Sequence, residues 1–123
     1  MISIVDDDAS VRRATQVLIK SLGYSATAFA SAREFLDSGF LGDTDCVIAD
    51  IHMPGMTGIE LQSHLAASGD HTPVILITAF PDDATRKRAL DGGALGFLSK
   101  PFKEESLVAC LQAALRQTQA LRS

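Results

Sequence analysis

Four short apolar runs are spaced along the chain, and three of them are rich in Val or Ile and bounded by Asp, Pro, Gly or Thr. The runs are Ile2–Val5, Cys46–Ala49, Val74–Ile77 and Gly96–Leu98. Continuous apolar runs of this length are typical of strands that are buried on both faces, as in a parallel sheet. The segment Tyr24–Phe29 has a weaker pattern of the same kind and is predicted to be a further strand.

Helical patterns lie between the predicted strands. A glycine at position 23 closes the first helix, whose apolar residues share one face: Val11, Ala14, Val17, Leu18 and Leu22. The capping box Ser31–Glu34 starts the second helix. The third covers about Gly58–Ser68, and the fourth follows residues 81–83 and ends at the glycines 92–93. The fifth has its apolar residues at helical spacing: Leu107, Leu111, Ala114, Leu115 and Leu121.

Strands that alternate with helices in this way predict an α/β fold with right-handed crossovers and a doubly wound parallel sheet. For five strands, the flavodoxin-like (βα)5 arrangement with strand order 2-1-3-4-5 is the leading choice. In such a sheet a functional site lies beyond the carboxyl ends of the strands, at the switch point beside strands 1 and 3.

Polar residues follow four of the five predicted strands. The first is followed by residues 6–8, all aspartates, the third by Asp50, the fourth by Thr78 and the fifth by Ser99-Lys100-Pro101. Capping of the next helix accounts for Asp8, but one cap suffices for one helix and leaves the other two acids unexplained. Capping does not account for Asp50 either, because no helix begins directly after it.

Three carboxylates at one edge of a sheet repel one another unless a cation is present. Oxygen ligands of this kind suit a hard divalent ion such as Mg²⁺, which keeps waters or phosphate oxygens in the rest of its octahedron. Lys100 can pair with an anion bound beside the metal, and the Thr78 hydroxyl can donate a hydrogen bond to the same anion. The candidate ligand is a phosphoryl group, which an aspartate can accept as an acyl phosphate.

These residues resemble the receiver domains of two-component response regulators, and the resemblance covers essentially the whole chain. Five motifs in the same order carry it: residues 4–7 (Ile-Val-Asp-Asp), 49–58 (Ala-Asp-Ile-His-Met-Pro-Gly-Met-Thr-Gly), 77–79 (Ile-Thr-Ala), 92–97 (Gly-Gly-Ala with Phe97) and 100–102 (Lys-Pro-Phe). Each motif is weak by itself, whereas all five at this spacing are highly specific.

The resemblance implies a role for each matching acid. Asp50 corresponds to the phosphoryl acceptor. Asp7 and Asp50 would bind Mg²⁺ through their carboxylates, together with the backbone carbonyl of His52. Asp6 would act mainly through a metal-bound water.

The resemblance also implies a switch and a partner. Lys100 would hold a phosphoryl oxygen, Thr78 would turn its hydroxyl toward another, and Phe97 would be the switch aromatic that follows Thr78 inward. The phosphoryl donor would be a sensor histidine kinase, and the surface of the fourth helix, fifth strand and fifth helix would change shape. The family pattern further favours a cis peptide bond at Lys100-Pro101.

The segments Met53–Gly58 and Thr78–Pro81 resemble the FixJ/LuxR-type transcriptional regulators, which join a receiver to a helix-turn-helix module. We therefore expect residues 1–123 to be a single receiver domain excised from a longer regulator. The domain would control dimerisation or an output module, and DNA would be contacted only through a C-terminal module. The alternative is a stand-alone receiver that relays phosphate or binds a protein partner without DNA binding.

Composition agrees with one soluble domain, since 46% of the 123 residues are hydrophobic and 21% are charged. The net charge of −4 makes the domain a poor candidate for binding nucleic acid or an anionic membrane directly. Cys46 and Cys110 form no CxxC motif and are expected to be reduced thiols. The start of the chain lacks the basic and long apolar regions of a signal peptide, so a cytoplasmic location without membrane contact is expected.

Three other functions are weighed against this interpretation. An aspartyl-phosphate phosphatase of a related fold uses a second Asp two residues after the nucleophile, where this chain has His52. A flavin-binding electron carrier needs a Ser/Thr/Gly-rich phosphate loop where this chain has three aspartates. A degenerate receiver would lack part of the set formed by Asp7, Asp50, Thr78 and Lys100. We therefore expect no enzyme in the ordinary sense, only self-phosphorylation and autodephosphorylation.

Overall fold

The computed structural model describes residues 1–122, with side chains described as far as residue 120. Ser123, the last residue of the predicted domain, lies outside the described residues, as does the side chain of Leu121 on the predicted apolar face of the fifth helix. No helix within residues 1–122 combines the length and apolar character that crossing a membrane requires.

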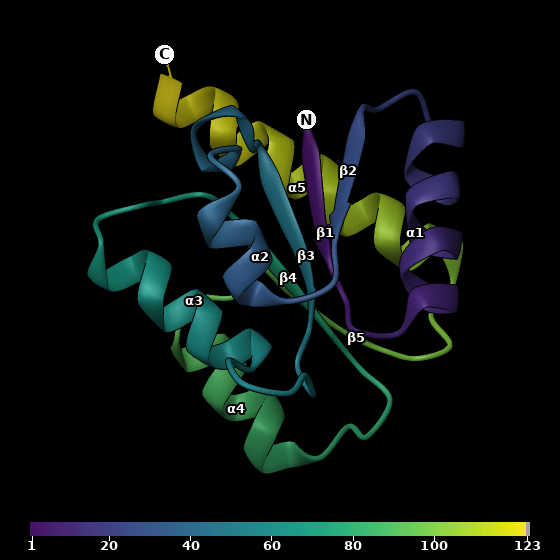
Figure 1. Cartoon of the computed structure of the whole chain (residues 1–123), viewed down its shortest axis with the longest axis vertical. Helices are drawn as coiled ribbons and strands as arrows, with labels where there is room; N and C mark the ends of the chain where they lie inside the picture. Colours follow the sequence, from purple (N-terminus) through teal and green to yellow (C-terminus); the bar gives the residue numbers. More distant parts are fainter. Residues whose placement is uncertain (123) are drawn as a thin grey trace.

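Five parallel strands form one sheet in the order β2-β1-β3-β4-β5, which confirms the predicted fold (Figure 1). The strands are β1 (Ile2–Val5), β2 (Ala26–Phe29), β3 (Cys46–Asp50), β4 (Val74–Thr78) and β5 (Gly96–Ser99). The helices are α1 (Ala9–Ser21), α2 (Ala32–Asp37), α3 (Gly58–Ala67), α4 (Asp83–Asp91) and α5 (Glu104–Arg122), with a short 3-10 turn, η1 (Leu41–Asp43). The register places Val5 opposite both Phe29 and Ala49, so β1 pairs with strands on both sides.

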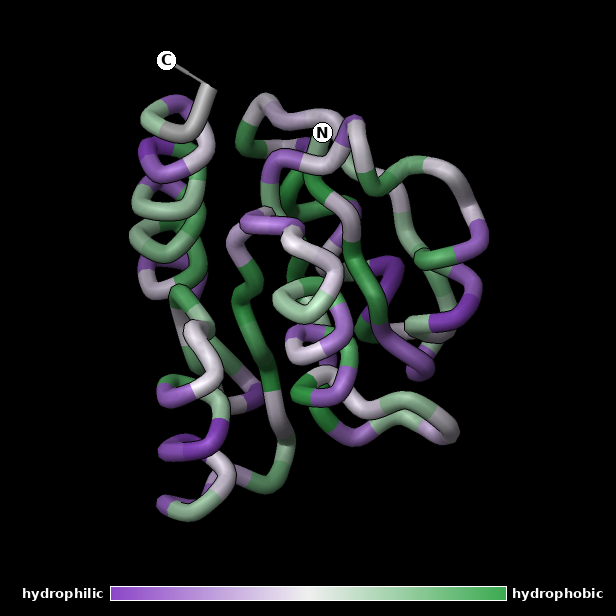
Figure 2. The backbone as a smooth tube through the Cα atoms, turned by 90° about the vertical axis from the view of Figure 1, so that its left-hand side faces the viewer, coloured by the Kyte–Doolittle hydropathy of each residue, from purple (hydrophilic) through white to green (hydrophobic). Residues whose placement is uncertain are grey.

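Helices cover both faces of the sheet, and the alternation of side chains along the strands supplies one core to each face. On one face Val47, Ala49 and Leu76 pack with buried residues of α2, α3 and α4. On the other face Ile48 and Ile75 pack with buried residues of α1 and α5. Figure 2 shows the hydrophobic stretches concentrated in the central strands and the hydrophilic residues on the outer helices and loops.

The first predicted strand matches β1, whereas each of the other four differs from the observed strand at one end by one or two residues. Asp50, Thr78 and Ser99 are the last residues of β3, β4 and β5, whereas the sequence pattern placed them just after the strands. Backbone pairing with a neighbouring strand extends past the apolar run, for example between Asp50 and Ile77. Asp50 and Thr78 are therefore held by the sheet itself.

The predicted apolar face of the first helix is wrong at Ala14, which is exposed, and at Val17, whose exposed fraction is 60%. The buried residues of α1 are Thr15 and Ile19, four positions apart on one side of the helix. Val17 lies two positions from each of them, which at about 100° per residue places it on the opposite side. Asp8 caps this helix as predicted, by accepting hydrogen bonds from the N–H groups of Ser10 and Val11.

The predicted capping box at the start of α2 is half formed. Ser31 Oγ accepts a hydrogen bond from the N–H of Glu34 at 3.0 Å, but the Glu34 carboxylate accepts from Ala30 rather than from Ser31. A reciprocal box occurs instead at the start of α3, between Thr57 and Glu60. Both arrangements provide hydrogen-bond acceptors for N–H groups at the start of a helix. The conformation of the preceding loop determines which N–H group the glutamate carboxylate accepts from.

Candidate functional site: an acidic pocket at the carboxyl ends of the strands

Three aspartates converge where β1 and β3 end. Carboxylate oxygens of Asp6, Asp7 and Asp50 lie within 4.8 Å of one another, with Asp6 and Asp50 buried and Asp7 exposed. Asp6 and Asp7 directly follow β1, and Asp50 ends β3, the neighbouring strand. The cluster therefore lies at the switch point of the sheet, where the strand pattern predicts a site.

A lysine from the end of β5 reaches the same cluster. Lys100 Nζ lies 3.1 Å from Asp6 Oδ2 and 3.3 Å from Asp50 Oδ2. The backbone N–H of Lys100 donates to the Thr78 carbonyl at 2.8 Å, and the Lys100-Pro101 peptide bond is cis, as predicted. The ammonium neutralises part of the charge of the acids. It can also pair with an anion that binds beside them.

Burial raises the pKa of Asp50 above its ordinary value, and the charge of Asp6 adds to the rise. The ammonium of Lys100 and the N–H of His52, which donates to Asp50 Oδ1 at 3.3 Å, oppose the rise. Burial by itself would lower the pKa of Lys100, but its hydrogen bonds with Asp6 and Asp50 and their charges outweigh burial and raise it. Lys100 is therefore a cation at neutral pH.

Close backbone packing holds the loop that follows Asp50. The N–H of Gly58 donates to the Ile51 carbonyl at 3.0 Å, and the start of α3 lies directly against the end of β3. A methyl group on Gly58 would overlap the backbone carbonyl oxygen of Asp50 and lie 3.1 Å from the Ile51 α-carbon. Glycine at this position lets α3 approach the end of β3.

Thr78 is fully buried at the end of β4, on the β5 side of the cluster. Its hydroxyl oxygen accepts a hydrogen bond from the N–H of Phe80 at 3.0 Å. This contact ties the hydroxyl to the β4–α4 loop and leaves the hydroxyl proton available for another acceptor. Movement of the hydroxyl would therefore break or shift this hydrogen bond and change the position of the loop that leads into α4.

Phe97 is half-buried on β5, opposite Leu76 of β4, and packs against the core that α2, α3 and α4 cover. It also borders a cavity of about 230 Å³ beside the start of α4, lined by Pro81, Asp82, Asp83, Arg86, Phe97 and Ser99. The aromatic ring is thus placed between the core and an open space, next to the loop that Thr78 holds.

Two side chains near the pocket have contacts that the sequence analysis did not predict. The imidazole of His52 lies edge-on to the ring of Phe80, with ring centroids 5.7 Å apart, and both side chains are exposed. Arg12 reaches back from α1 to the backbone carbonyl of Asp6. A cation one turn into the helix that follows an acid cluster is a signal that could have pointed to Arg12.

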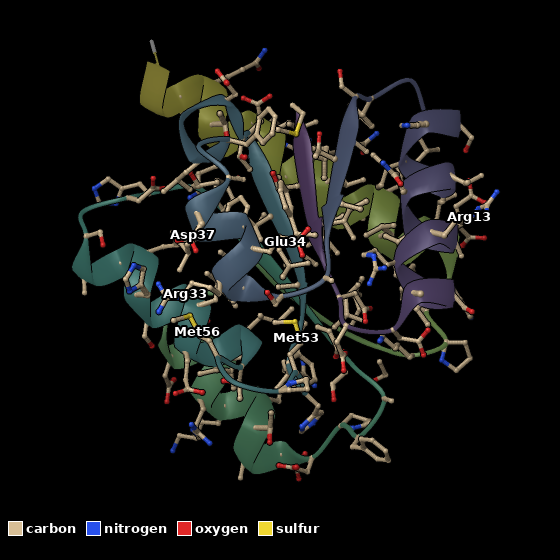
Figure 3. The ribbon with its side chains drawn as sticks, in the orientation of Figure 1. Arg13, Arg33, Glu34, Asp37, Met53 and Met56 are labelled. Atoms are coloured by element: carbon tan, nitrogen blue, oxygen red, sulfur yellow. The ribbon has the colours of Figure 1, made fainter. Side chains whose placement is uncertain are left out.

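Met53 and Met56, labelled in Figure 3, lie in the loop between β3 and α3. Met53 is buried, Met56 is half-buried, and both belong to the core on the side of α2, α3 and α4. His64 and His71 are exposed, and the two cysteines are free thiols, Cys46 buried and Cys110 half-buried. These residues lie outside the acidic pocket.

The donor set of the pocket fits a hard divalent cation. Three carboxylates from adjoining segments supply oxygen atoms, the ligands that Mg²⁺ prefers, and the ammonium of Lys100 binds two of them. The exposed acid Asp7 leaves one side of the cluster open to solvent. The pocket can therefore hold a metal and an oxyanion side by side.

Comparison with known proteins agrees with this geometry. The family profile of the response regulator receiver domain matches residues 2–112. Nodulation protein W of Bradyrhizobium diazoefficiens is 38% identical over 122 residues, which are 99% of this chain and 54% of the relative. Transcriptional regulatory protein FixJ of Azorhizobium caulinodans is 38% identical over 114 residues, which are 93% of this chain and 54% of the relative.

A solved structure is similar as well. The response regulator StyR superimposes with a TM-score of 0.90 at 38% identity, and the match covers 98% of this chain and 61% of StyR. The chain spans about half the length of the curated relatives it matches.

Proposed function

Because the chain belongs to the response regulator receiver domain family, we propose that it accepts a phosphoryl group on Asp50 from a sensor histidine kinase. The observation that carries the proposal is the convergence of three carboxylates within 4.8 Å, with the Lys100 ammonium bonded to two of them. The domain acts on itself and is not an enzyme with an external product.

The metal in this proposal is Mg²⁺, held by the carboxylates of Asp7 and Asp50 and the backbone carbonyl of His52, with Asp6 acting through a bound water. When bound, Mg²⁺ offsets negative charge on the transferring phosphoryl group. Lys100 then turns from its two carboxylate partners to a phosphoryl oxygen. The acids and the lysine are ordered before the donor arrives, so positioning and electrostatics supply most of the rate.

The transfer itself is a displacement at phosphorus. A carboxylate oxygen of Asp50 forms a bond to phosphorus while the bond from phosphorus to the donor imidazole nitrogen breaks. The imidazole nitrogen retains the electron pair and accepts a proton. Hydrolysis of the acyl phosphate by water later restores the Asp50 carboxylate and releases inorganic phosphate, so the signal has a finite lifetime.

The output is a shift between two packings of the β4–β5 edge. In the structure Thr78 Oγ1 accepts from Phe80, and in the phosphorylated state the hydroxyl donates to a phosphoryl oxygen instead. The loop into α4 then rearranges, and Phe97 moves into the space that Thr78 leaves. The surface formed by α4, β5 and α5 changes shape, and this change controls dimerisation or an output module.

The output that we favour is transcriptional regulation through a C-terminal DNA-binding module of a longer protein. Its support is the relative named transcriptional regulatory protein FixJ, of which the chain spans about half. The domain carries a net charge of −4, which disfavours direct DNA contact by the receiver itself.

Acetyl phosphate tests the acceptor without the kinase. With Mg²⁺ present, intact-protein mass spectrometry should detect one added phosphoryl group, and a metal chelator should prevent its addition. Asp50→Asn should abolish the addition, whereas the control Asp91→Asn, which removes an exposed carboxylate at the end of α4, should leave it unchanged. Full labelling of the Asp50→Asn protein would contradict the assignment of Asp50.

A further inference from the structure

The side chain of Arg12 reaches back from the first turn of α1 to the loop that carries two of the pocket acids. Its Nη1 donates a hydrogen bond to the backbone carbonyl oxygen of Asp6 at 2.8 Å, and the residue is half-buried. A guanidinium is planar and presents its N–H donors in a fixed arrangement. The contact therefore links α1 to the pocket.

The oxygen that Arg12 binds belongs to the peptide group between Asp6 and Asp7. A peptide group is planar, so holding its oxygen sets the orientation of the whole plane and of the bonds at both neighbouring α-carbons. The side chains attached to those α-carbons carry two of the three clustered carboxylates. On the other side, the N–H of Asp6 donates to the Phe29 carbonyl at 3.1 Å. The strand edge thus holds the amide of Asp6, and Arg12 holds its carbonyl.

The segment that runs from Asp6 into the first turn of α1 is also closed by its own hydrogen bonds. The N–H of Asp8 donates to Asp6 Oδ1 at 2.9 Å, and the N–H of Arg12 donates to the Asp8 carbonyl at 2.9 Å. The backbone of Arg12 thus binds Asp8 through the first hydrogen bond of the helix, and its guanidinium binds Asp6. Asp7 lies between these two residues, and its exposed side chain depends on the loop backbone for its direction.

We propose that Arg12 is a positioning residue of the metal pocket: it orients the peptide group between Asp6 and Asp7 so that both carboxylates face Asp50, where Asp7 binds Mg²⁺ and Asp6 holds a metal-bound water. The inference rests on the proposed function, because it assumes that the pocket binds this metal. Arg12 does not contact the metal and acts through the two acids. Removal of a contact that orients metal ligands typically weakens metal binding by about 10–100-fold.

The loss of charge and the loss of positioning predict opposite changes in Mg²⁺ affinity when the Arg12 side chain is replaced. Loss of a positive charge near a cation site strengthens cation binding by Coulomb's law, whereas loss of positioning weakens it. Arg12→Met retains an unbranched apolar stem and removes both the donor and the charge. Arg13→Met makes the same change at the next residue, which is exposed and extends from the outer side of α1 (Figure 3).

The experiment is a calorimetric titration of the folded proteins with MgCl₂. We expect Arg12→Met to raise the dissociation constant about tenfold or more. Arg12→Lys should recover most of the affinity, because an ammonium retains a donor and the charge. Arg13→Met should stay within about twofold of the wild type, since an exposed charge is screened. An unchanged or lower dissociation constant in Arg12→Met would overturn the inference.

Urea unfolding of the metal-free proteins separates positioning from a general loss of stability. A merely structural contact would lower the unfolding midpoint and leave the Mg²⁺ affinity of the folded protein unchanged, which also overturns the inference. If Arg12→Met does not fold, Arg12→Gln, with a shorter and neutral side chain, enters the same comparison with the same expectation.

Failure of the proposed function has a different signature from failure of this inference. If the wild type shows no Mg²⁺ binding that Asp50→Asn weakens, the metal pocket is wrong, and the role of Arg12 is wrong with it. If the wild type binds Mg²⁺ through Asp50 and Arg12→Met binds it equally well, only the role of Arg12 is wrong.

Discussion

Lys100 Nζ lies 3.3 Å from Asp50 Oδ2, so the cation that directly follows β5 pairs with one carboxylate oxygen of the last residue of β3. The same ammonium lies 3.1 Å from Asp6. A metal at the acid cluster and the lysine therefore compete for two of the same carboxylates. An anion that takes over the ammonium would end this competition, which links phosphoryl binding to metal binding.

Lys100→Met should separate these two effects. We expect Mg²⁺ to bind roughly tenfold more tightly, because a mostly buried unit charge a few ångström from the acids is removed. Transfer from acetyl phosphate should become slower, because no cation meets the phosphoryl oxygen. Calorimetry with MgCl₂ and mass spectrometry of the acyl phosphate measure the two quantities. Lys103→Met, at an exposed position, is the control, and weaker Mg²⁺ binding in Lys100→Met would contradict the competition.

The Thr78 hydroxyl provides a test of the switch. In the structure it accepts the N–H of Phe80 at 3.0 Å, and we expect phosphorylation to break this bond. The amide resonance of Phe80 should therefore shift when acetyl phosphate and Mg²⁺ are added, as measured by nitrogen-15 NMR.

Two variants complete that test. Thr78→Ser retains the hydroxyl and should retain the shift, whereas Thr78→Ala should accept the phosphoryl group without transmitting a change to the Phe97 resonances. A normal response of Phe97 in Thr78→Ala would show that the switch does not pass through this hydroxyl.

Gly58→Ala should destabilise the protein, because the added methyl group overlaps the backbone carbonyl of Asp50. Overpacking against backbone that cannot move typically costs about 1–3 kcal/mol, and we expect the free energy of unfolding to fall by about that amount. Gly42→Ala is the matched control, since no atom lies within 4 Å of the added carbon there. Urea unfolding followed by circular dichroism measures both. Equal stability of the two variants would argue against close packing at Gly58.

The raised pKa of the buried Cys46 thiol predicts that the protein loses stability at high pH. Burial in the core, with smaller effects of Cys110 and Asp45, raises the pKa of Cys46 from 9.0 to about 12. The folded state therefore keeps a proton that the unfolded chain loses above pH 9. The resulting stabilisation is complete below pH 9 and is lost as the pH rises toward 12.

At pH 10.5 this thiol should lower the free energy of unfolding by about 2 kcal/mol relative to pH 8. Urea unfolding of the wild type and of Cys46→Ala at both pH values isolates the contribution, because the other titrating groups are shared. The difference between the two proteins should change with pH in the stated direction. A pH-independent difference would mean that the thiol titrates normally in the fold.

Much of the fold could be predicted because its signals are local. Apolar runs such as Val74–Ile77 and caps such as Asp8 depend on residues near one another in the sequence. The strand order and the position of the acidic pocket followed from the alternation of strands and helices, since a doubly wound sheet has few allowed topologies.

The predictions were wrong where the buried face of a helix or the partner of a capping side chain depends on tertiary packing. Val17 is apolar and belongs to the predicted face, but α1 is oriented so that Thr15 and Ile19 are buried instead. At Ser31 the side chains suited a reciprocal cap, but the entering loop offered the N–H of Ala30 to Glu34. Neither result is visible in a local pattern, because each depends on the angle at which one segment meets another.

The sequence by itself determined which residues reach the carboxyl edge of the sheet: Asp6, Asp7, Asp50, Thr78 and Lys100 all end or follow strands, and chain order sets that. Only the tertiary structure decided how they meet. The bonding of Lys100 to two acids, the link from Arg12 to the peptide between Asp6 and Asp7, and the contact of His52 with Phe80 join different segments. Such contacts depend on distances of a few ångström, which the packing of helices and loops on the sheet sets and no spacing along the chain encodes.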